Sequence, residues 1–263
     1  MPATDLDLLI KAALAAGDVA RQYTGPSAKV WDKPGGAGPV TEADLAVNQV
    51  LEDTLRSARP DYGWLSEESE DDGTRLTRER VFIVDPIDGT RSFIEGSHTW
   101  AHSIGLVEQG KVVAGVIYLP MRHKLYAAAL GEGATLNQDK LSVGAKKQLS
   151  GATMLAAKPN FDARHWRAGE QPGLVRNFRP SLAYRMALVA EGRFDAMMTL
   201  RGAWEWDIAA GALILTEAGA AISDRDGAAL LFNNQAPKLP GVLAANPVLH
   251  GELRETLKSG ATI

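Results

Sequence analysis

Cysteine is absent from all 263 residues of the chain. Its absence excludes disulfide bonds, thiolate metal sites, iron–sulfur clusters and a cysteine nucleophile. A chain without cysteine fits a reducing cytoplasm, which is the location that we expect. With 263 residues, the chain is long enough to bury a large core without covalent cross-links, in one large domain or two smaller ones.

Long apolar segments and an excess of positive charge are also missing. No apolar run approaches the roughly 18 to 20 residues that cross a bilayer, and the N-terminus lacks the basic flank of a signal peptide. The formal net charge is −4, so the chain has no excess of positive charge to bind a nucleic-acid backbone. We therefore expect neither a membrane nor a nucleic acid as partner. An anionic substrate would need a local source of positive charge.

Hydrophobic periodicity divides the chain into two parts. The N-terminal part combines helical spacing with short apolar runs, which predict helices at 4–22 and 41–59 and strands at 81–84, 103–107, 112–119 and 124–129. Gln109-Gly110 between two of these runs predicts a hairpin, and hence a largely antiparallel sheet. The C-terminal part alternates, with helices predicted at 181–192 and 208–218 and strands at 153–157, 196–199 and 241–244. We predict an N-terminal α+β domain over 1–140 and a C-terminal α/β domain over 141–263.

A loop rich in glycine and proline, residues 33–39, separates the two predicted N-terminal helices. It contains neither the GK[ST] ending of a phosphate loop nor a GxGxxG pattern, so it is not a nucleotide-binding fingerprint. Two interpretations remain open for this segment, a mobile connector and a mobile active-site flap.

Two carboxylates follow a predicted buried strand. Asp85 and Asp88 lie around a proline-containing bend that can direct both at one point, and the carbonyl oxygen of Ile87 can act as a further ligand. Oxygen-only ligands suit Mg²⁺. Gly89 and Thr90 then present backbone N–H groups at the start of a predicted helical turn, where a phosphate oxygen can bind. An ordinary turn is the alternative, because Asp-Pro and Asp-Gly are common turn formers.

Two more acidic segments lie elsewhere in the chain. Glu67 and Glu68 follow the apolar pair Trp64-Leu65 after a single serine, whereas the acids at 70–72 are expected to form a solvated face. Asp207 precedes a run of small residues that allows a helix to pack closely on a neighbour. Helix capping is the alternative role for Asp207, and packing is the alternative for the tryptophans at 204 and 206.

These motifs together resemble those of the inositol monophosphatase family of lithium-sensitive, magnesium-dependent phosphatases. Ser66-Glu67-Glu68-Ser69 is similar to the family's G-E-E-S. Residues 85–90 resemble D-P-[IL]-D-G-T, and residues 206–210 with 218–219 resemble W-D-x-A-A and A-G. Residues 40–44 resemble V-T-x-x-D, and Lys33 stands where the family has a flap lysine. The resemblance covers residues 6–246 and implies a layered αβαβα sandwich and a homodimer.

The resemblance also implies two to three Mg²⁺ ions in each active site. Glu67, Asp85 and the Ile87 carbonyl would hold the first ion. Asp85, Asp88 and Asp207 would hold the second, and Glu67 would also contact a weaker third ion.

The catalytic residues implied by the resemblance are Thr90, Asp44 and Glu68. Thr90, paired with Asp44, would orient and help deprotonate the attacking water, with Glu68 close behind. A metal ion lowers the pKa of a bound water and a second one stabilises the leaving oxygen, so the reaction needs no protein nucleophile. Gly89 and Thr90 would bind the phosphate.

Departures from the family pattern concern the substrate. Leu200 stands where animal inositol monophosphatases have a glutamate that contacts the inositol ring, and Arg201 follows it. Ser181 and Arg201 are therefore candidates for substrate binding. The expected partner is a small phosphorylated metabolite, with inositol monophosphate or a related sugar phosphate ranked first. The alternatives are a 3'(2'),5'-bisphosphate nucleotide, histidinol phosphate, and a catalytically silent regulatory or binding protein on the same fold.

Overall fold

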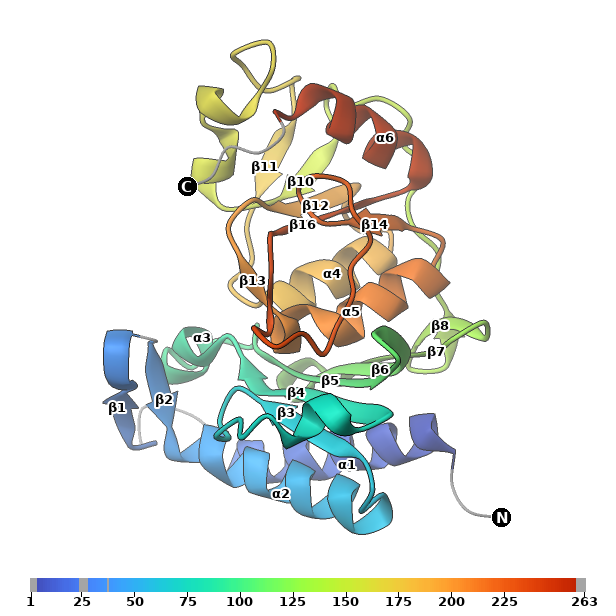
Figure 1. Cartoon of the computed structure of the whole chain (residues 1–263). Helices are drawn as coiled ribbons and strands as arrows, with labels where there is room; N and C mark the ends of the chain where they lie inside the picture. The colour runs from blue at the N-terminus through green and yellow to red at the C-terminus, as the bar shows by residue number, and fades with distance from the viewer. Residues whose placement is uncertain (1–3, 24–27, 37, 259–263) are drawn as a thin grey trace.

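Five layers of secondary structure form the molecule, in the order α, β, α, β, α (Figure 1). The computed structural model describes residues 4–23, 28–36 and 38–258. This layered arrangement confirms the fold class predicted from the sequence. The helices are α1 (Asp5–Ala20), α2 (Glu42–Ala58), α3 (Thr90–Ile94), α4 (Leu182–Ala190), α5 (Glu205–Glu217) and α6 (Pro247–Thr256).

A seven-stranded sheet forms the second layer, with α1 and α2 on its outer face (Figure 1). All neighbouring strands are antiparallel except β3 and β4, and the hairpin predicted at Gln109-Gly110 joins β5 to β6. Both turn residues have positive φ, as a tight two-residue hairpin requires. In sheet order the strands are β3 (Gly63–Ser66), β4 (Arg80–Asp88), β5 (Ala101–Glu108), β6 (Lys111–Leu119), β7 (Lys124–Ala129), β8 (Gly133–Leu136) and β9 (Asp139–Lys140).

A five-stranded mixed sheet forms the fourth layer, between the α4–α5 pair and α6 (Figure 1). Side chains alternate across this sheet: Met197 packs toward α4 and α5, whereas Met198 packs toward α6. Its strands, in order, are β11 (Val175–Asn177), β10 (Thr153–Leu155), β12 (Ala196–Thr199), β16 (Val242–Ala245) and β14 (Ala221–Ser223). Two small hairpin sheets pair β1 (Val30–Asp32) with β2 (Pro39–Thr41) and β13 (Ala203–Trp204) with β15 (Lys238–Leu239).

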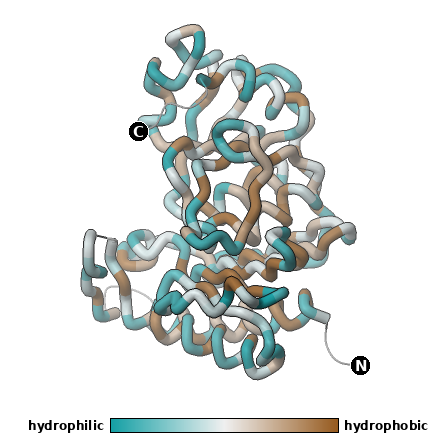
Figure 2. Tube along the Cα trace, in the orientation of Figure 1, coloured by the Kyte–Doolittle hydropathy of each residue, from teal (hydrophilic) through white to brown (hydrophobic). Residues whose placement is uncertain are grey.

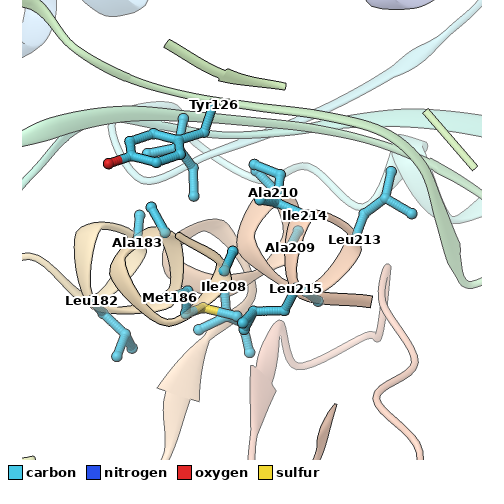
Figure 3. Close-up of a cluster of buried hydrophobic side chains, with 14 of the residues drawn as sticks. Tyr126, Leu182, Ala183, Met186, Ile208, Ala209, Ala210, Leu213, Ile214 and Leu215 are labelled. Carbon is cyan, nitrogen blue, oxygen red and sulfur yellow. The ribbon is translucent and has the colours of Figure 1, made fainter. Parts of the chain in front are cut away.

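Hydrophobic residues concentrate in the inner layers, and polar residues cover the outer loops (Figure 2). The largest buried cluster lies where α4 and α5 meet the seven-stranded sheet, with Tyr126, Met186 and Ile214 among its members (Figure 3). This cluster combines residues from both predicted domains. The division of the chain at residue 140 stays a prediction, and residues 1–3, 24–27, 37 and 259–263 of those two ranges lie outside the described part.

Glycine allows α5 to lie directly on the sheet. Gly105 of β5 and Gly115 of β6 face each other across the strand pair, beneath Ala209 and Ala210 of α5. A Cβ on Gly115 would lie 3.0 Å from the Ala210 carbonyl oxygen and 3.1 Å from its Cα. The small residues after Asp207 therefore pack closely on a neighbour, as the sequence predicted. Their packing brings the start of α5 to the sheet.

We expect Gly115→Ala to lower the free energy of unfolding by about 1 to 3 kcal/mol, because the added methyl group meets helix backbone that cannot rotate away. Urea denaturation measures the change. Gly251→Ala is the matched control, since an added Cβ in this position of α6 meets nothing within 4 Å and alanine favours a helix. Equal stability of the two variants would contradict the close-packing argument.

Most predicted helix and strand ends differ from the structure by a few residues, and the two differences that affect the site are at β4 and α5. The strand predicted at 81–84 continues to Asp88, and α5 begins at Glu205 rather than at residue 208. The described residues of the predicted loop, 33–36 and 38–39, connect β1 and β2 of a short hairpin, in which the Lys33 N–H donates to the Gly38 carbonyl oxygen at 2.9 Å. Among the described residues, no helix is both long enough and apolar enough to span a membrane.

Candidate active site

A β-bulge at the end of β4 directs two acidic side chains to the same side of the sheet. Asp85 pairs with Ser103 of β5 and Asp88 pairs with Ala101, so Pro86 and Ile87 together face His102 alone. In a regular strand, residues three apart point to opposite faces, and the extra residue of the bulge removes this difference. The buried His102 ring contacts the Pro86 carbonyl oxygen through Nδ1 and supports the bulge from the neighbouring strand.

Asp207 joins this pair from the first turn of α5. Carboxylate oxygens of Asp85, Asp88 and Asp207 lie within 4.8 Å of one another. The Ser103 hydroxyl donates to the Trp206 carbonyl oxygen at 2.8 Å, which ties the start of α5 to the strand opposite Asp85. Since the helix begins at Glu205 with Trp204 as its N-cap residue, Asp207 is not the cap of α5. The capping alternative for Asp207 is therefore wrong.

Burial disfavours the charged form of all three carboxylates. Burial, followed by the charges of Glu67 and Asp88, raises the pKa of Asp85 well above its ordinary value. Burial and then the Asp88 charge do the same to the pKa of Asp207. The pKa of Asp88 rises to about 6 because burial outweighs the hydrogen bonds from Ser181 Oγ and the Ala183 N–H, both at 2.6 Å.

A divalent cation fits this group of acids. Within the described part of the chain, the buried Asp85 Oδ1 has no hydrogen-bond donor. A buried carboxylate oxygen without a donor, close to two further carboxylates, is destabilising unless a cation neutralises the group. The donor atoms are all oxygens, which is the ligand set that Mg²⁺ prefers.

Glu67 and Glu68 lie beside the three aspartates and bind the lysine of the β1–β2 hairpin. Lys33 Nζ is 2.8 Å from Glu67 Oε1 and 2.6 Å from Glu68 Oε1. Burial raises the pKa of Glu68 to about 7, although the Lys33 hydrogen bond opposes the shift. The structure thus brings Lys33 into the site, as the flap interpretation requires. Glu67 does not belong to the group of carboxylates whose oxygens lie within 4.8 Å of one another, so its role as a metal ligand stays a prediction.

Thr90 and Asp44 also meet at the site. Thr90 Oγ1 lies 3.3 Å from Asp44 Oδ1 and 3.2 Å from the Ile87 carbonyl oxygen, and its single proton can go to either acceptor. Gly89, with φ of 100°, is the N-cap residue of α3, so Thr90 is the first residue of this helix and not its cap. Burial raises the pKa of Asp44 to about 6, against the hydrogen bonds that it accepts from Thr41.

Asp44 has a structural role that the sequence analysis missed. Its carboxylate accepts the Thr41 N–H at 2.8 Å, while Thr41 Oγ1 accepts the Asp44 N–H, and together they form a capping box at the start of α2. The signal was present in the sequence, since a threonine three residues before an acid marks such a helix start.

The two predicted substrate residues occupy different environments. Ser181 is fully buried at the N-cap of α4, where its hydroxyl donates to Asp88 and accepts the Tyr184 N–H at 3.0 Å. Arg201 is exposed. Its positive charge opposes the rise in the pKa of Asp207, which places it near the acids. The substrate roles of both residues stay predictions, as do the phosphate-binding roles of Gly89 and Thr90.

Arg185 is a site residue without a sequence signal. Its side chain is largely buried in α4, and its Nε donates to the Arg179 carbonyl oxygen at 2.5 Å. Burial lowers the pKa of Arg185 to about 10, while the charges of Asp88 and Asp207 act in the opposite direction. The sequence around Arg185 is an apolar helical pattern, which gives no sign of a functional role for the arginine. Only the packing of α4 beside the acids shows that Arg185 belongs to the site.

The rings of Trp204 and Trp206, next to Asp207 in the sequence, stack with centroids 4.8 Å apart.

The five-layer fold and its group of acids fit an enzyme that hydrolyses phosphate esters, and the comparison with known proteins decides the class. The model of the inositol monophosphatase family matches residues 2–261, and the chain belongs to this family. It is therefore a phosphatase that acts on phosphorylated metabolites.

Relatives of known name support this assignment over most of the chain. An inositol-1-monophosphatase of Rhizobium meliloti is 36% identical over 239 residues, which are 84% of this chain and 86% of that protein. The Nus factor SuhB of Escherichia coli is 33% identical over 268 residues, or 96% and 98% of the two chains. The solved structure of an IMPase from Thermotoga maritima, 28% identical, covers 95% of each chain with a TM-score of 0.81.

Proposed function

We propose that the protein is a Mg²⁺-dependent phosphomonoesterase, with inositol monophosphate or a related sugar phosphate as substrate. The observation that carries the proposal is the group of Asp85, Asp88 and Asp207, of which the first two are buried and the third is half-buried, and in which one carboxylate oxygen has no donor among the described residues. With Glu67 and the Ile87 carbonyl oxygen, these side chains would hold two to three ions. A homodimer is part of the proposal, on the basis of the family resemblance.

The chemistry divides between the ions and the side chains around them. Bound Mg²⁺ supplies Lewis acidity, which lowers the pKa of water and neutralises charge on the phosphate. The lone pairs of Thr90 Oγ1 accept a proton from the attacking water, while the Thr90 proton moves toward Asp44 Oδ1, 3.3 Å away. Asp44, with a pKa of about 6, is mostly ionised at neutral pH and can accept that proton. Lys33 adds positive charge beside Glu67 and Glu68 for an anionic substrate.

A 3'(2'),5'-bisphosphate nucleotide is the second candidate substrate. The observation that favours it is the pair of arginines near the acids, Arg185 and Arg201, since a second phosphate needs a second source of positive charge. The partly exposed Trp204 offers an aromatic surface close to Asp207. Inositol monophosphate ranks first because the Rhizobium meliloti relative is an inositol-1-monophosphatase.

A panel of phosphorylated metabolites, assayed with Mg²⁺ and a phosphate readout, tests the proposal. We expect phosphate release that requires Mg²⁺ and that Li⁺ and excess Ca²⁺ inhibit, because Ca²⁺ is larger and tolerates looser coordination. Unchanged phosphate release in excess EDTA would exclude the metal mechanism. A protein with no activity on any compound, despite bound Mg²⁺, would favour the regulatory alternative, for which the SuhB relative is a precedent by its name.

A further inference from the structure

Arg75 is one of the largest fully buried side chains of the molecule, with only 1% of its surface exposed. It lies in a short 3₁₀ helix, Thr74–Thr77, that packs against β3. A buried guanidinium is costly unless every N–H that it directs into the protein finds an acceptor. Its partners therefore reveal which segments of the chain it holds together.

One side of the planar guanidinium group of Arg75 binds the segment that carries Glu67 and Glu68. Nε of Arg75 is 3.0 Å from both carboxylate oxygens of Asp71, and Nη2 is 2.8 Å from Asp71 Oδ2. Asp71 follows Glu68 by three residues. This paired geometry fixes the orientation of both groups as well as their distance.

The other side of the guanidinium group binds a loop of the C-terminal half. Nη1 of Arg75 donates to Asn233 Oδ1 at 2.6 Å, and Nη2 donates to the Asn234 carbonyl oxygen at 2.9 Å. One guanidinium thus connects two segments that are far apart in the sequence. Lysine, with a single ammonium group, cannot span both sets of acceptors with this geometry.

Glu205 continues the connection to the first turn of α5. Its fully buried carboxylate accepts the Asn233 N–H at 2.7 Å, the Asn234 N–H at 3.0 Å and the Asn234 side-chain amide at 2.7 Å. Glu205 is the first residue of α5 and precedes Asp207 by two positions. Hydrogen bonds therefore run from the segment of Glu67, through Arg75, to the segment of Asp207.

We propose that Arg75 is a positioning residue for cation binding, which holds the segments of Glu67 and Asp207 at the separation that a divalent ion needs. The inference rests on the proposed function, because it assumes that these acids bind Mg²⁺. In the metal-free protein the negative charges of Glu67 and Asp207 repel each other. A rigid link between their segments opposes that repulsion, so less rearrangement remains when the ion binds.

Calorimetric titration with Mg²⁺ alone tests the inference on three single variants. Arg75→Lys keeps the positive charge and removes the planar guanidinium group with its several N–H donors. Asn233→Gly removes one acceptor and keeps the backbone conformation, since Asn233 has φ of 64°. Lys124→Met is the matched control, because it breaks an ion pair between β7 and Glu191 at the far end of α4. All three variants lose a link between the N-terminal and C-terminal halves of the chain.

We expect Arg75→Lys and Asn233→Gly each to weaken Mg²⁺ binding by about tenfold, the size of effect typical for residues that support metal ligands. Lys124→Met should bind Mg²⁺ as tightly as wild type, even if its melting temperature falls as much as those of the two test variants. At saturating Mg²⁺, kcat and KM of both test variants should return to wild-type values. The double variant should lose no more affinity than Arg75→Lys alone, because both residues act through one link.

Unchanged Mg²⁺ affinity in Arg75→Lys and Asn233→Gly would overturn the inference, and so would an equal loss in Lys124→Met. A wild-type protein that binds no Mg²⁺ would instead overturn the proposed function, and the inference with it. The two failures are therefore distinguishable in the same titrations.

Discussion

Asp207→Asn is expected to reduce kcat by ~10²- to 10³-fold or more, the loss typical when an electrostatic group of an active site is removed. In EDTA at pH 8, the same variant is expected to melt at a higher temperature than wild type. Both results have one cause, because the charge that would hold the ion is also a negative charge that repels the neighbouring carboxylates. Asp88→Asn should behave in the same way, since its carboxylate belongs to the same group.

The stability advantage of Asp207→Asn should depend on pH. The pKa of Asp207 is raised in the folded protein, whereas that of an unfolded aspartate is about 3.9. The folded protein therefore binds this proton more tightly, and the stability that it contributes is lost as the pH rises above about 4. Wild type and Asp207→Asn should be equally stable near pH 4 and differ increasingly above it. Melting curves in EDTA across this interval measure the difference, in which the titrating groups far from Asp207 cancel and the response of the neighbouring acids to its charge remains included.

Asp139→Asn supplies the control for Asp207→Asn, because Asp139 is an exposed carboxylate on the edge strand β9. It should change neither kcat nor the pH dependence of melting. Wild-type kcat in Asp207→Asn at saturating Mg²⁺ would remove this residue from the proposed ligands. A lower melting temperature in EDTA at pH 8 would contradict the repulsion argument.

Thr90→Ala is the second change with a large expected effect, a loss of ~10²- to 10⁴-fold in kcat with little change in KM. The reason is the contact between Thr90 Oγ1 and Asp44 Oδ1, which provides a path for the proton of the attacking water. Thr90→Ser keeps the hydroxyl and should retain most of the activity. Steady-state kinetics at saturating Mg²⁺ give both parameters.

Asp44→Asn and the double variant complete this test. Residues that act as one unit give non-additive losses, so the double variant should be about as slow as Thr90→Ala. Because Asp44 also closes the capping box of α2, Asp44→Asn is expected to cost about 0.5 to 2 kcal/mol of stability as well. The rates must be compared at a temperature where both proteins are folded. Fully additive rate losses would exclude Asp44 from the proton path.

Local sequence patterns were sufficient to predict most of the elements. The strand predicted at 196–199 matches β12, because its apolar residues lie between clear turn signals. The end of β4 was predicted too early, since Pro86 and Asp88 are typical turn residues and only the pairing with β5 shows that they continue the strand through a bulge. The five-layer order came from the family resemblance, because periodicity does not specify how helices and sheets stack.

Motifs identified the acids of the site but not the residues that place them. Asp85, Asp88 and Asp207 were predicted as one group, and the structure brings them together. The roles of His102 and Ser103 depend on strand register, and the role of Arg75 depends on a loop far away in the sequence. Such contacts are set by tertiary packing, which no local pattern encodes.

The route by which Asp207 reaches the other acids has a consequence for the folding kinetics. Asp85 and Asp88 lie on one strand, β4, whereas Asp207 arrives only when α5 has docked on Gly105 and Gly115. Docking closes a long loop of chain, and contacts of this kind form late and slowly. An ion that needs all three carboxylates binds after that step. We therefore expect Mg²⁺ to slow unfolding and to leave the folding rate nearly unchanged.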